Sequence, residues 1–344
     1  MSVMGSKCSK AIKRLKLFMG TSRCIVVTLT KLTTLTALVA LALFIPCLVS
    51  CDFNGALFSG TIGNPFVENS YDFPLDGSED PSFVIVSDVH LGREGNDHGA
   101  KRYDSKFLSF LKDGAGRWSA MLSLGDFIDE DNVGLQTECG FLDSFVPYCS
   151  NRFIGVVGNH ETHVSSMEAW EDSLHSSGGI DVFMKRMAVY RFGDVSIYVM
   201  DNAKRTFGYM QLDYLEEALE RDGSAVKIVL AHENVFTGRK LDQSLVVFGN
   251  FSATEMARFS RILRDNDVSL VLTGHTHNGG VVYSYGDGCH EMNLASYHGY
   301  DGLMDMEGNG NWYVLSIHRA SREIVVTTYD APTAKAVAKD RFGY

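Results

Sequence analysis

The sequence predicts an α/β fold. From residue 82 onward, short runs rich in β-branched and aromatic residues alternate with helix-like stretches, as in sheets whose strands are joined by helices. Five of these runs end in a polar residue or a glycine, and the carboxyl ends of strands are where such sheets hold their active sites. The later runs follow one another without helices between them, so we expect a second sheet.

Strands are predicted wherever an apolar run is short and bounded by turn-forming residues. The runs that end in polar residues are 83–86, 120–124, 153–157, 226–231 and 268–273. Their near-continuous apolar character is typical of strands that are buried on both faces. Further strands are predicted at 190–192, 195–200, 281–283, 313–317 and 324–328.

Helices are predicted between these strands at 103–112, 166–176, 209–221 and 252–265. The last of them opens with Ser252 and has Glu255 three residues later, which is the pattern of a capping box. We therefore expect one catalytic domain over residues 82–333. Residues 51–81 are rich in turn formers and are expected to be a tether with at most one edge strand, and residues 334–344 are expected to be a polar tail.

The N-terminal segment has the pattern of an export signal. Residues 1–51 carry seven basic and no acidic residues, and residues 32–50 are free of charge. The run ends Leu48-Val49-Ser50-Cys51, which resembles the bacterial lipobox, so residues 1–50 would be removed and Cys51 lipidated. The alternative is an uncleaved signal anchor that spans the bilayer. Both interpretations place the domain outside the cytoplasm, membrane-anchored at the bacterial cell envelope.

The remainder of the chain is acidic. After Cys51 it contains 24 basic and 42 acidic residues, a net charge of −18. General nucleic-acid binding needs basic surface, so we expect no nucleic-acid partner but a small substrate. Three cysteines follow Cys51; Cys139 and Cys149 could pair in an exported protein, or all three could be thiols.

Metal-type side chains end the predicted strands in a fixed order. They are Asp88 and His90, Asp126, Asn159, His232, and His275 and His277. Each motif alone is a weak signal, but the ordered set predicts two divalent cations that hold a phosphate ester and activate water. Asp126 is the expected bridge, because a carboxylate has two oxygens. Asp88, His90 and His277 would complete one site, and Asn159, His232 and His275 the other.

The predicted ligands are nitrogen and oxygen atoms, which suits Mn, Fe or Zn. Glycines at 125, 158 and 274 would let the backbone approach the ions closely. His160 follows Asn159 and is the candidate general acid that protonates the leaving alkoxide. Asp129, three residues after the bridge, is the candidate residue that holds the His160 ring. Arg93 is a weaker candidate for contact with a phosphate.

These residues resemble the calcineurin-like metallophosphoesterases. The family pattern, D-x-H, G-D, G-N-H-[DE], H and G-H-x-H, is met in full between Asp88 and His277, with Glu161 in the fourth position of its third motif. The resemblance implies a four-layer αββα sandwich and a dinuclear centre. It also implies hydrolysis by a metal-bound hydroxide in line with the leaving group.

The sequence departs from the patterns of two subfamilies, which argues against membership of either. Asp129 stands where purple acid phosphatases have a tyrosine ligand, and Glu130-Asp131 stands where protein Ser/Thr phosphatases have Arg-Gly. We therefore expect a single-domain phosphodiesterase or phosphomonoesterase. The alternatives are a hydrolase of a phosphorylated envelope lipid or glycan, and a non-catalytic binding module on the same fold.

Overall fold

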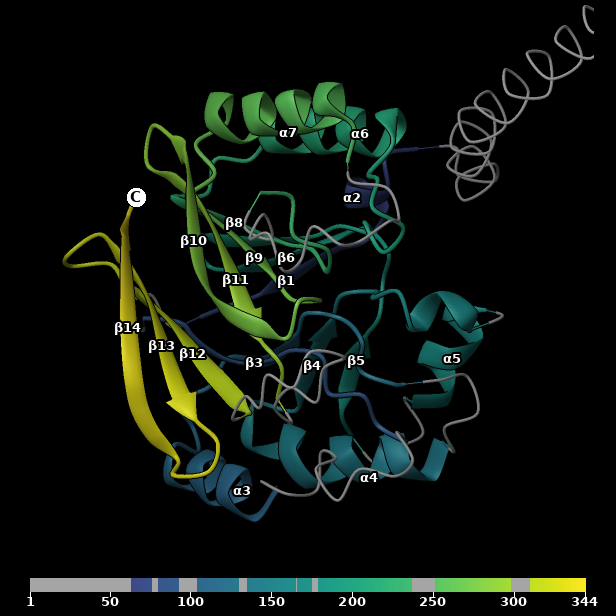
Figure 1. Ribbon diagram of the computed structural model, residues 1–344, viewed down its shortest axis with the longest axis vertical. Helices are drawn as coiled ribbons and strands as arrows, with labels where there is room; N and C mark the ends of the chain where they lie inside the picture. Colours follow the sequence, from purple (N-terminus) through teal and green to yellow (C-terminus); the bar gives the residue numbers. More distant parts are fainter. Residues whose placement is uncertain are drawn as a thin grey trace, which may run out of the picture. The chain divides into compact units, whose positions relative to one another are not determined.

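The computed structural model describes residues 63–75, 80–92, 104–129, 135–164, 166–174, 179–236, 251–297 and 310–344. All of these ranges lie in the unit Thr61–Tyr344. Element labels follow Figure 1. Within the described ranges, no helix is both long and apolar enough to cross a bilayer. The segment that carries the predicted export signal and Cys51 lies outside them.

Two sheets form the centre of the fold, and each has 7 strands. The strands of the first sheet, in spatial order, are β1 (Ser70–Phe73), β6 (Ala188–Phe192), β7 (Val195–Val199), β8 (Val226–Leu230), β9 (Leu270–Thr273), β11 (Cys289–Ala295) and β10 (Asn278–Gly286). Those of the second sheet are β14 (Lys335–Gly343), β13 (Glu323–Asp330), β12 (Asn311–His318), β2 (Ser82–Val86), β3 (Ala120–Ser123), β4 (Arg152–Gly155) and β5 (Asp181–Phe183). Strands β2 to β5 pair in parallel, as do β7 to β9, so their carboxyl ends share an edge.

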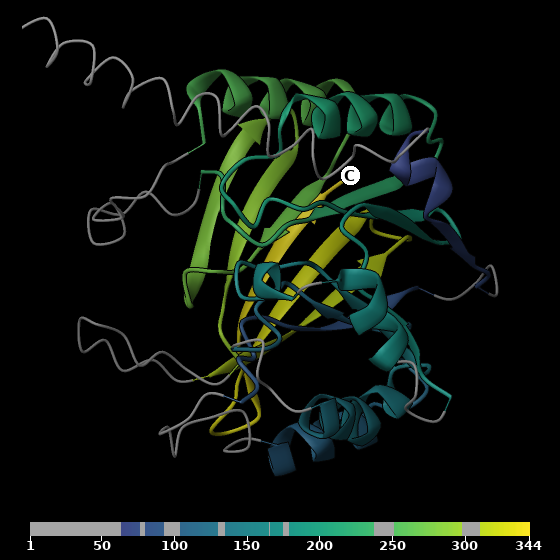
Figure 2. The same cartoon turned by 90° about the vertical axis from the view of Figure 1, so that its right-hand side faces the viewer.

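Helices cover the outer faces of both sheets (Figures 1 and 2). The described helices are α2 (Pro65–Glu68), α3 (Asp104–Asp113), α4 (Leu135–Phe145), α5 (Met167–Leu174), α6 (Tyr209–Glu220) and α7 (Ala253–Asp265), with short 3-10 turns at Val146–Tyr148 and Glu161–His163. Helices α6 and α7 lie over the first sheet, and α3 and α4 lie over the second. The four-layer αββα sandwich is therefore confirmed.

Packing on both faces of the sheets explains why the strands are continuous apolar runs in the sequence. Along β2, Phe83 and Ile85 face the space between the sheets, where they pack with residues of β8 such as Ile228. Val84 and Val86 point to the opposite face and pack with Phe107 of α3. Successive side chains of a strand alternate between its faces, so a strand that is covered on both sides needs apolar residues throughout.

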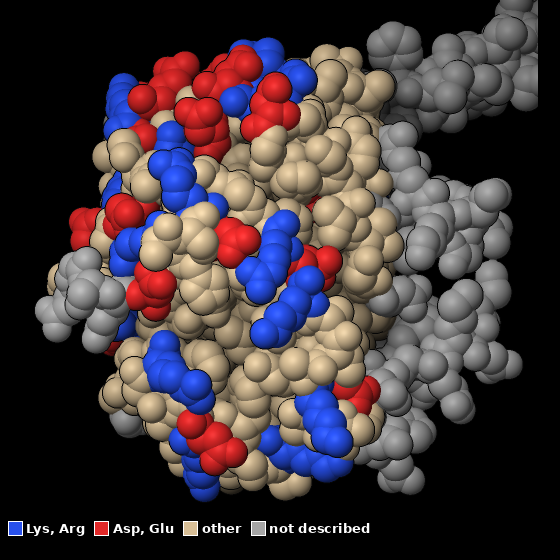
Figure 3. Space-filling view, turned by 90° about the vertical axis from the view of Figure 1, so that its left-hand side faces the viewer, with Lys and Arg blue, Asp and Glu red and all other residues tan. Residues whose placement is uncertain are grey.

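Lys227 links helices α6 and α7 to β8, the strand that precedes His232. This lysine is buried on β8, and its Nζ donates to the carbonyl oxygens of Leu219 and Asn266 at 3.3 and 3.0 Å. Both acceptors lie at helix carboxyl ends, where a cation is stabilising. On the surface, arginines of α7 form ion pairs with acidic residues of α6. On the face drawn in Figure 3, acidic and basic side chains alternate at the top, where α7 lies.

Two predicted boundaries are wrong. The supposed polar tail is the edge strand β14, which pairs antiparallel with β13. It is mostly exposed, and Phe342 is its buried apolar residue, so its polar composition reflects an edge position. The predicted domain start at 82 is too late, because α2 and the expected edge strand β1 already belong to the sandwich. The sequence reading also missed α4, β5 and β11. The helix N-cap at Ser252 is as predicted, since its side chain accepts from the Glu255 N–H.

Candidate metal centre

All seven predicted ligands meet at one edge of the sandwich. Asp88, Asp126 and Asn159 directly follow strands β2, β3 and β4 of the second sheet or stand a few residues beyond them. His232 and His275 follow β8 and β9 of the first sheet in the same way. The described residues contain three groups of donor atoms that could hold a cation, with all atoms of a group within 4.8 Å of one another: Asp88/His90/Asp126/His277, Asp126/His232/His275 and His90/Asp129/His160. The first two contain the predicted ligands and share Asp126.

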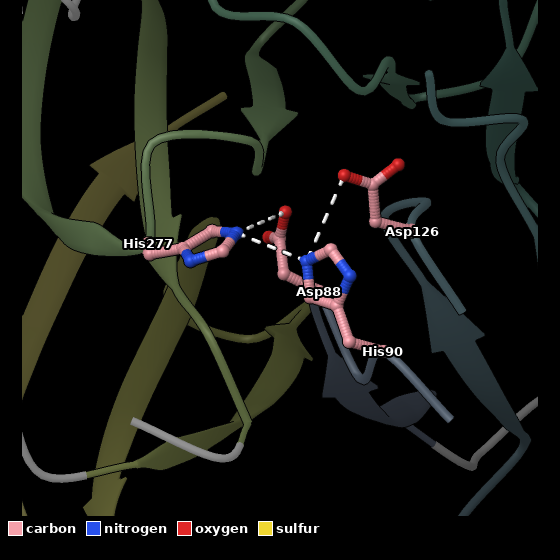
Figure 4. Close-up of side chains that lie close together, drawn as sticks. All are labelled: Asp88, His90, Asp126 and His277. Carbon is pink, nitrogen blue, oxygen red and sulfur yellow. Dashed lines mark hydrogen bonds and ion pairs between the residues drawn. The ribbon is translucent and has the colours of Figure 1, made fainter. Parts of the chain in front are cut away.

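The first cluster is formed by Asp88, His90, Asp126 and His277, and Figure 4 shows these four side chains pointing toward one another. His90 Nε2 lies 3.1 Å from His277 Nε2 and 3.8 Å from Asp126 Oδ2. His277 Nε2 lies 3.4 Å from Asp88 Oδ1. Three loops from two sheets therefore bring four donor atoms around one point.

The second cluster is formed by Asp126, His232, His275 and Asn159. His232 Nε2 is its hub, at 3.3 Å from Asp126 Oδ2, 3.2 Å from His275 Nδ1 and 3.0 Å from Asn159 Oδ1. Asn159 completes the set as a neutral oxygen donor. The two clusters therefore contain the residues that the sequence grouped together.

Asp126 is shared by both clusters, but through one oxygen. Oδ2 is the atom that approaches His90 and His232, whereas Oδ1 accepts a hydrogen bond from the His160 N–H at 3.0 Å. Asp126 therefore stands between the two clusters, where the sequence predicted a bridge. The backbone amide of His160 fixes the carboxylate so that a single oxygen faces both clusters.

The donor set fits divalent cations. Metal–imidazole bonds of about 2.0–2.1 Å place neighbouring donors about 3.0–3.4 Å apart around one ion, and most of the donor contacts given above fall in that range. Without a cation, a contact such as that between the two Nε2 atoms of His90 and His277 would need a proton on one of them. The arrangement of imidazole nitrogens with carboxylate and amide oxygens suits Mn, Fe or Zn.

The backbone at the ligands is strained. Asp88, His90, Asp126, His275 and His277 all adopt positive φ, between 47° and 67°. The left-handed region costs a residue with a side chain about 1–3 kcal/mol, and such strain persists mainly at functional sites. Five predicted ligands adopt this conformation, which orients their side chains at a cost in folding free energy.

Two glycines make the close approach possible. A Cβ on Gly158 would lie 2.3 Å from both the N and the Oδ1 of Asp126. A Cβ on Gly274 would lie 2.2 Å from Ser87 Oγ and 2.7 Å from Asp88 Oδ2. Real Cβ atoms do not approach this closely, so any side chain at these positions would displace a predicted ligand. The glycines are required for space, as the sequence indicated.

Hydrogen bonds behind the ligands set which ring nitrogen faces the centre. His232 Nδ1 lies 2.8 Å from the Leu124 carbonyl oxygen, so Nδ1 carries the proton and Nε2 is left to bind a cation. His275 is oriented the other way, because its Nε2 lies 3.2 Å from Glu233 Oε2. Asn202 supports this loop, since its Oδ1 accepts from the N–H groups of His232 and Glu233 at 3.0 and 2.9 Å.

Glu161 joins two of the ligand loops, a role that sequence reasoning missed. Its carboxylate is fully buried and accepts from the N–H groups of Phe127 and Ile128 through Oε1, and of Asp126 and Gly158 through Oε2, over 2.6–3.1 Å. Burial and the neighbouring Asp126 carboxylate raise the pKa of Glu161 to about 7, although the N–H donors oppose this. The acidic residue in the G-N-H-[DE] pattern was the available signal.

His160 lies at the rim of the centre, with 31% of its side chain exposed. Its Nε2 faces Asp126 Oδ2 at 3.9 Å, and its Nδ1 contacts the backbone carbonyl oxygen of Asp129. Asp129 therefore contacts the His160 ring, as predicted, but mainly through its main chain. The Asp129 carboxylate lies 2.9 Å from His90 Nδ1 but 3.9 Å from His160 Nδ1, so Asp129 orients the ligand His90 with its side chain and His160 with its main chain.

Charge at the centre favours cation binding. Burial opposes ionisation of Asp88, yet His277 and His232 lower its pKa to about 2, and histidines likewise hold the pKa of Asp126 well below its usual range. Burial, reinforced by His232, lowers the pKa of His275 to about 3. For His232, the Asp126 carboxylate outweighs burial and raises the pKa to about 10, so a cation must displace a proton there.

Some weaker candidates lie outside the described residues. Arg93, the weaker candidate for contact with a phosphate, is one of them. The described cysteines, Cys139, Cys149 and Cys289, are free thiols, so the possible Cys139–Cys149 bridge is not formed.

Comparison with known proteins places this arrangement in a family. The chain resembles GAP50, described as the anchor in the inner membrane complex of Plasmodium, with a TM-score of 0.51, 13% identity and coverage of 77% of this chain and 89% of that one. It also resembles purple acid phosphatase PPD1 from yellow lupin (Lupinus luteus) seeds, with a TM-score of 0.52, 11% identity and coverage of 77% and 54%. At such identities the likeness concerns the fold alone.

No curated protein matches the sequence. A family model described as calcineurin-like phosphoesterase matches residues 81–279, which is more than half of the chain. This range includes every predicted metal ligand from Asp88 to His277. The chain therefore belongs to the calcineurin-like phosphoesterase family.

Proposed function

We propose that this protein hydrolyses phosphate esters at a centre of two divalent ions, Mn, Fe or Zn. The observation that carries the proposal is the pair of donor clusters that share Asp126 Oδ2. Two ions bound there would neutralise phosphoryl oxygens and lower the pKa of a water for attack. Membership of the calcineurin-like phosphoesterase family supports the same chemistry.

The protein's own groups prepare the centre for an anionic substrate. Two ionised carboxylates, Asp88 and Asp126, stand against the charge of two divalent cations, which leaves the centre positive on an otherwise acidic chain. Such a site attracts phosphate esters electrostatically. Glu161 and the glycines hold the loops, so the ligands need little rearrangement when a substrate arrives.

His160 is the proposed general acid. Its Nδ1 is held by the Asp129 carbonyl oxygen, which directs Nε2 toward the clusters, and its partial exposure places it beside the incoming substrate. A proton on Nε2 can pass to the leaving alkoxide. Replacing His160 by Ala should lower turnover by about 10²–10⁴-fold for an alkyl phosphate, and far less for p-nitrophenyl phosphate, whose leaving group needs no proton. Equal losses on both substrates would remove His160 from this role.

The main test uses the full-length protein in detergent, loaded with Mn, Fe or Zn, on p-nitrophenyl phosphate and bis(p-nitrophenyl) phosphate. Asp126→Asn should abolish turnover and reduce the number of bound ions, because the clusters lose their shared charged oxygen. Asp172→Asn, at an exposed position on α5, is the matched control and should change neither. Absence of turnover with every metal would refute the proposal.

We also propose that the protein is exported and held at the membrane of a bacterial cell envelope. The basis is the uncharged stretch 32–50 and the lipobox-like ending at Cys51, both outside the described residues. Cys51→Ala should release the protein from the membrane fraction if lipid on this cysteine is the anchor. Retention of the variant would reject lipidation and favour the uncleaved anchor.

A further inference from the structure

Arg205 stands beside the second cluster, and the sequence motifs do not include it. Its Nη2 lies 3.4 Å from Nε2 of His275, the ring whose other nitrogen faces Asp126 and His232. The guanidinium is therefore one imidazole ring away from the nitrogen that faces the second cluster. The side chains of Arg205 and His275 are each 23% exposed, so both can be approached from solvent.

Glu233 holds the Arg205 guanidinium in place relative to His275. Its Oε1 lies 3.2 Å from Arg205 Nε, and its Oε2 lies 3.2 Å from His275 Nε2. The Glu233 carboxylate is only 6% exposed, whereas the guanidinium is several times more exposed. The carboxylate is thus the inner member of the pair, and the cation is the member that an arriving anion meets.

The backbone of Arg205 is strained in the same way as that of the ligands. Its φ is +59°, in the left-handed region, and its N–H donates to the Asn202 carbonyl oxygen at 2.8 Å. Asn202 in turn fixes the backbone of His232 and Glu233. An ion pair with Glu233 does not by itself require this conformation, and strain of this kind concentrates at functional sites.

Positive charge gathers around this turn. Arg186 pairs with Asp201, and Lys204 directly precedes Arg205. Partial burial and the nearby Arg186 lower the pKa of Lys204. On a chain that carries a net −18 after Cys51, a guanidinium in contact with His275 indicates recognition of an anion.

We propose that Arg205 binds a terminal phosphoryl oxygen of the substrate and selects phosphate monoesters over diesters. The inference rests on the proposed function. A monoester has three terminal oxygens, so two can face the two clusters and the third can accept from the guanidinium. A diester has two terminal oxygens, and both are needed at the clusters. The monoester also carries a charge of about −2 at neutral pH, against −1 for the diester.

The experiment compares Arg205→Gln, Arg205→Lys and wild-type full-length protein, each metal-loaded. Substrates are p-nitrophenyl phosphate and bis(p-nitrophenyl) phosphate, which share a leaving group. We expect kcat/KM of Arg205→Gln to fall about 10- to 100-fold for the monoester, as for loss of a hydrogen bond to a charged group, and less than about 3-fold for the diester. Arg205→Lys should lie between, because it keeps the charge and loses the planar fork.

Calorimetric titration with inorganic phosphate gives a second readout that is independent of turnover. Arg205→Gln should bind phosphate about 10- to 100-fold more weakly than wild type, while its bound-metal stoichiometry stays unchanged. Arg221→Gln, which removes an arginine that is 67% exposed on the far end of α6, is the matched control and should leave all values unchanged.

The outcomes separate this inference from the function on which it rests. If wild type hydrolyses neither ester, the proposed function fails. Suppose instead that wild type is active. If Arg205→Gln then lowers kcat/KM equally for both esters, or leaves phosphate affinity unchanged, the inference on Arg205 is overturned while the proposed function stands. Loss of bound metal in Arg205→Gln, with equal loss on both esters, would also overturn it, since Arg205 would then act only through His275.

Discussion

Replacing Glu161 by Gln should destabilise the protein strongly, although the two side chains have nearly the same shape. Both carboxylate oxygens accept two backbone N–H bonds each, in a fully buried position. A glutamine must turn its NH₂ group toward one of these pairs, so two buried N–H donors lose their acceptor. Each unsatisfied donor costs about 1–3 kcal/mol, which gives a loss of about 2–6 kcal/mol in the free energy of unfolding.

Glu255→Gln is the matched control. Glu255 is also buried, at 9% exposure, but it uses only Oε1, which accepts from Thr206, Phe207 and Gly208. A glutamine can keep its carbonyl oxygen on these donors and point its NH₂ group elsewhere. The expected loss is about 1 kcal/mol, for the weaker hydrogen bonds of a neutral acceptor.

The assay is urea denaturation of the metal-free proteins at pH 8, above the pKa of about 7 to which burial and Asp126 raise Glu161, so that the wild-type group is ionised. The number of ions bound after reloading is the second readout, and it should fall in Glu161→Gln because the Asp126 loop is no longer held. Equal stability losses in the two variants would refute the reasoning, since burial alone would then explain the effect.

Further predictions concern Asp129, the cysteines and Asp222. Asp129→Asn should weaken metal binding at the first cluster, because the Asp129 carboxylate holds His90. The dependence of turnover on the leaving group should stay unchanged, and a change in that dependence alone would contradict the structure. Iodoacetamide should alkylate the partly exposed Cys139 before Cys149, whose thiol pKa is raised by burial, and peptide mapping would show the reverse order if this is wrong. Hydroxyl donors lower the pKa of Asp222 against the effect of burial, so its carboxylate contributes stability that is present above about pH 4 and lost as pH falls. Asp222→Asn should therefore flatten the acid side of the stability profile, and an unchanged acid midpoint would argue against this.

Parts of the fold escaped sequence reading because position, not composition, determines their structure. Strand β14 is polar because it forms the edge of its sheet, and β11 carries the buried polar residues Glu291 and Asn293 among its apolar ones. Glu291 is satisfied by the N–H groups of Val235 and Phe236 and by the Tyr285 hydroxyl. No local pattern in the sequence indicates the partners Val235 and Phe236, which are 56 and 55 residues away.

The sequence by itself determined the strands that run through the core and the residues that form the two donor clusters. Core strands need apolar residues on both faces, and the ligands directly follow such strands, so both leave a local trace in the order of residues. Only the tertiary structure decided which oxygen of Asp126 faces both clusters, that the Asp129 carboxylate contacts His90, that Glu161 joins two of the loops, and that Arg205 contacts His275. These are contacts between loops far apart in the chain, and their direction depends on backbone angles and hydrogen bonds that exist only once both sheets have packed.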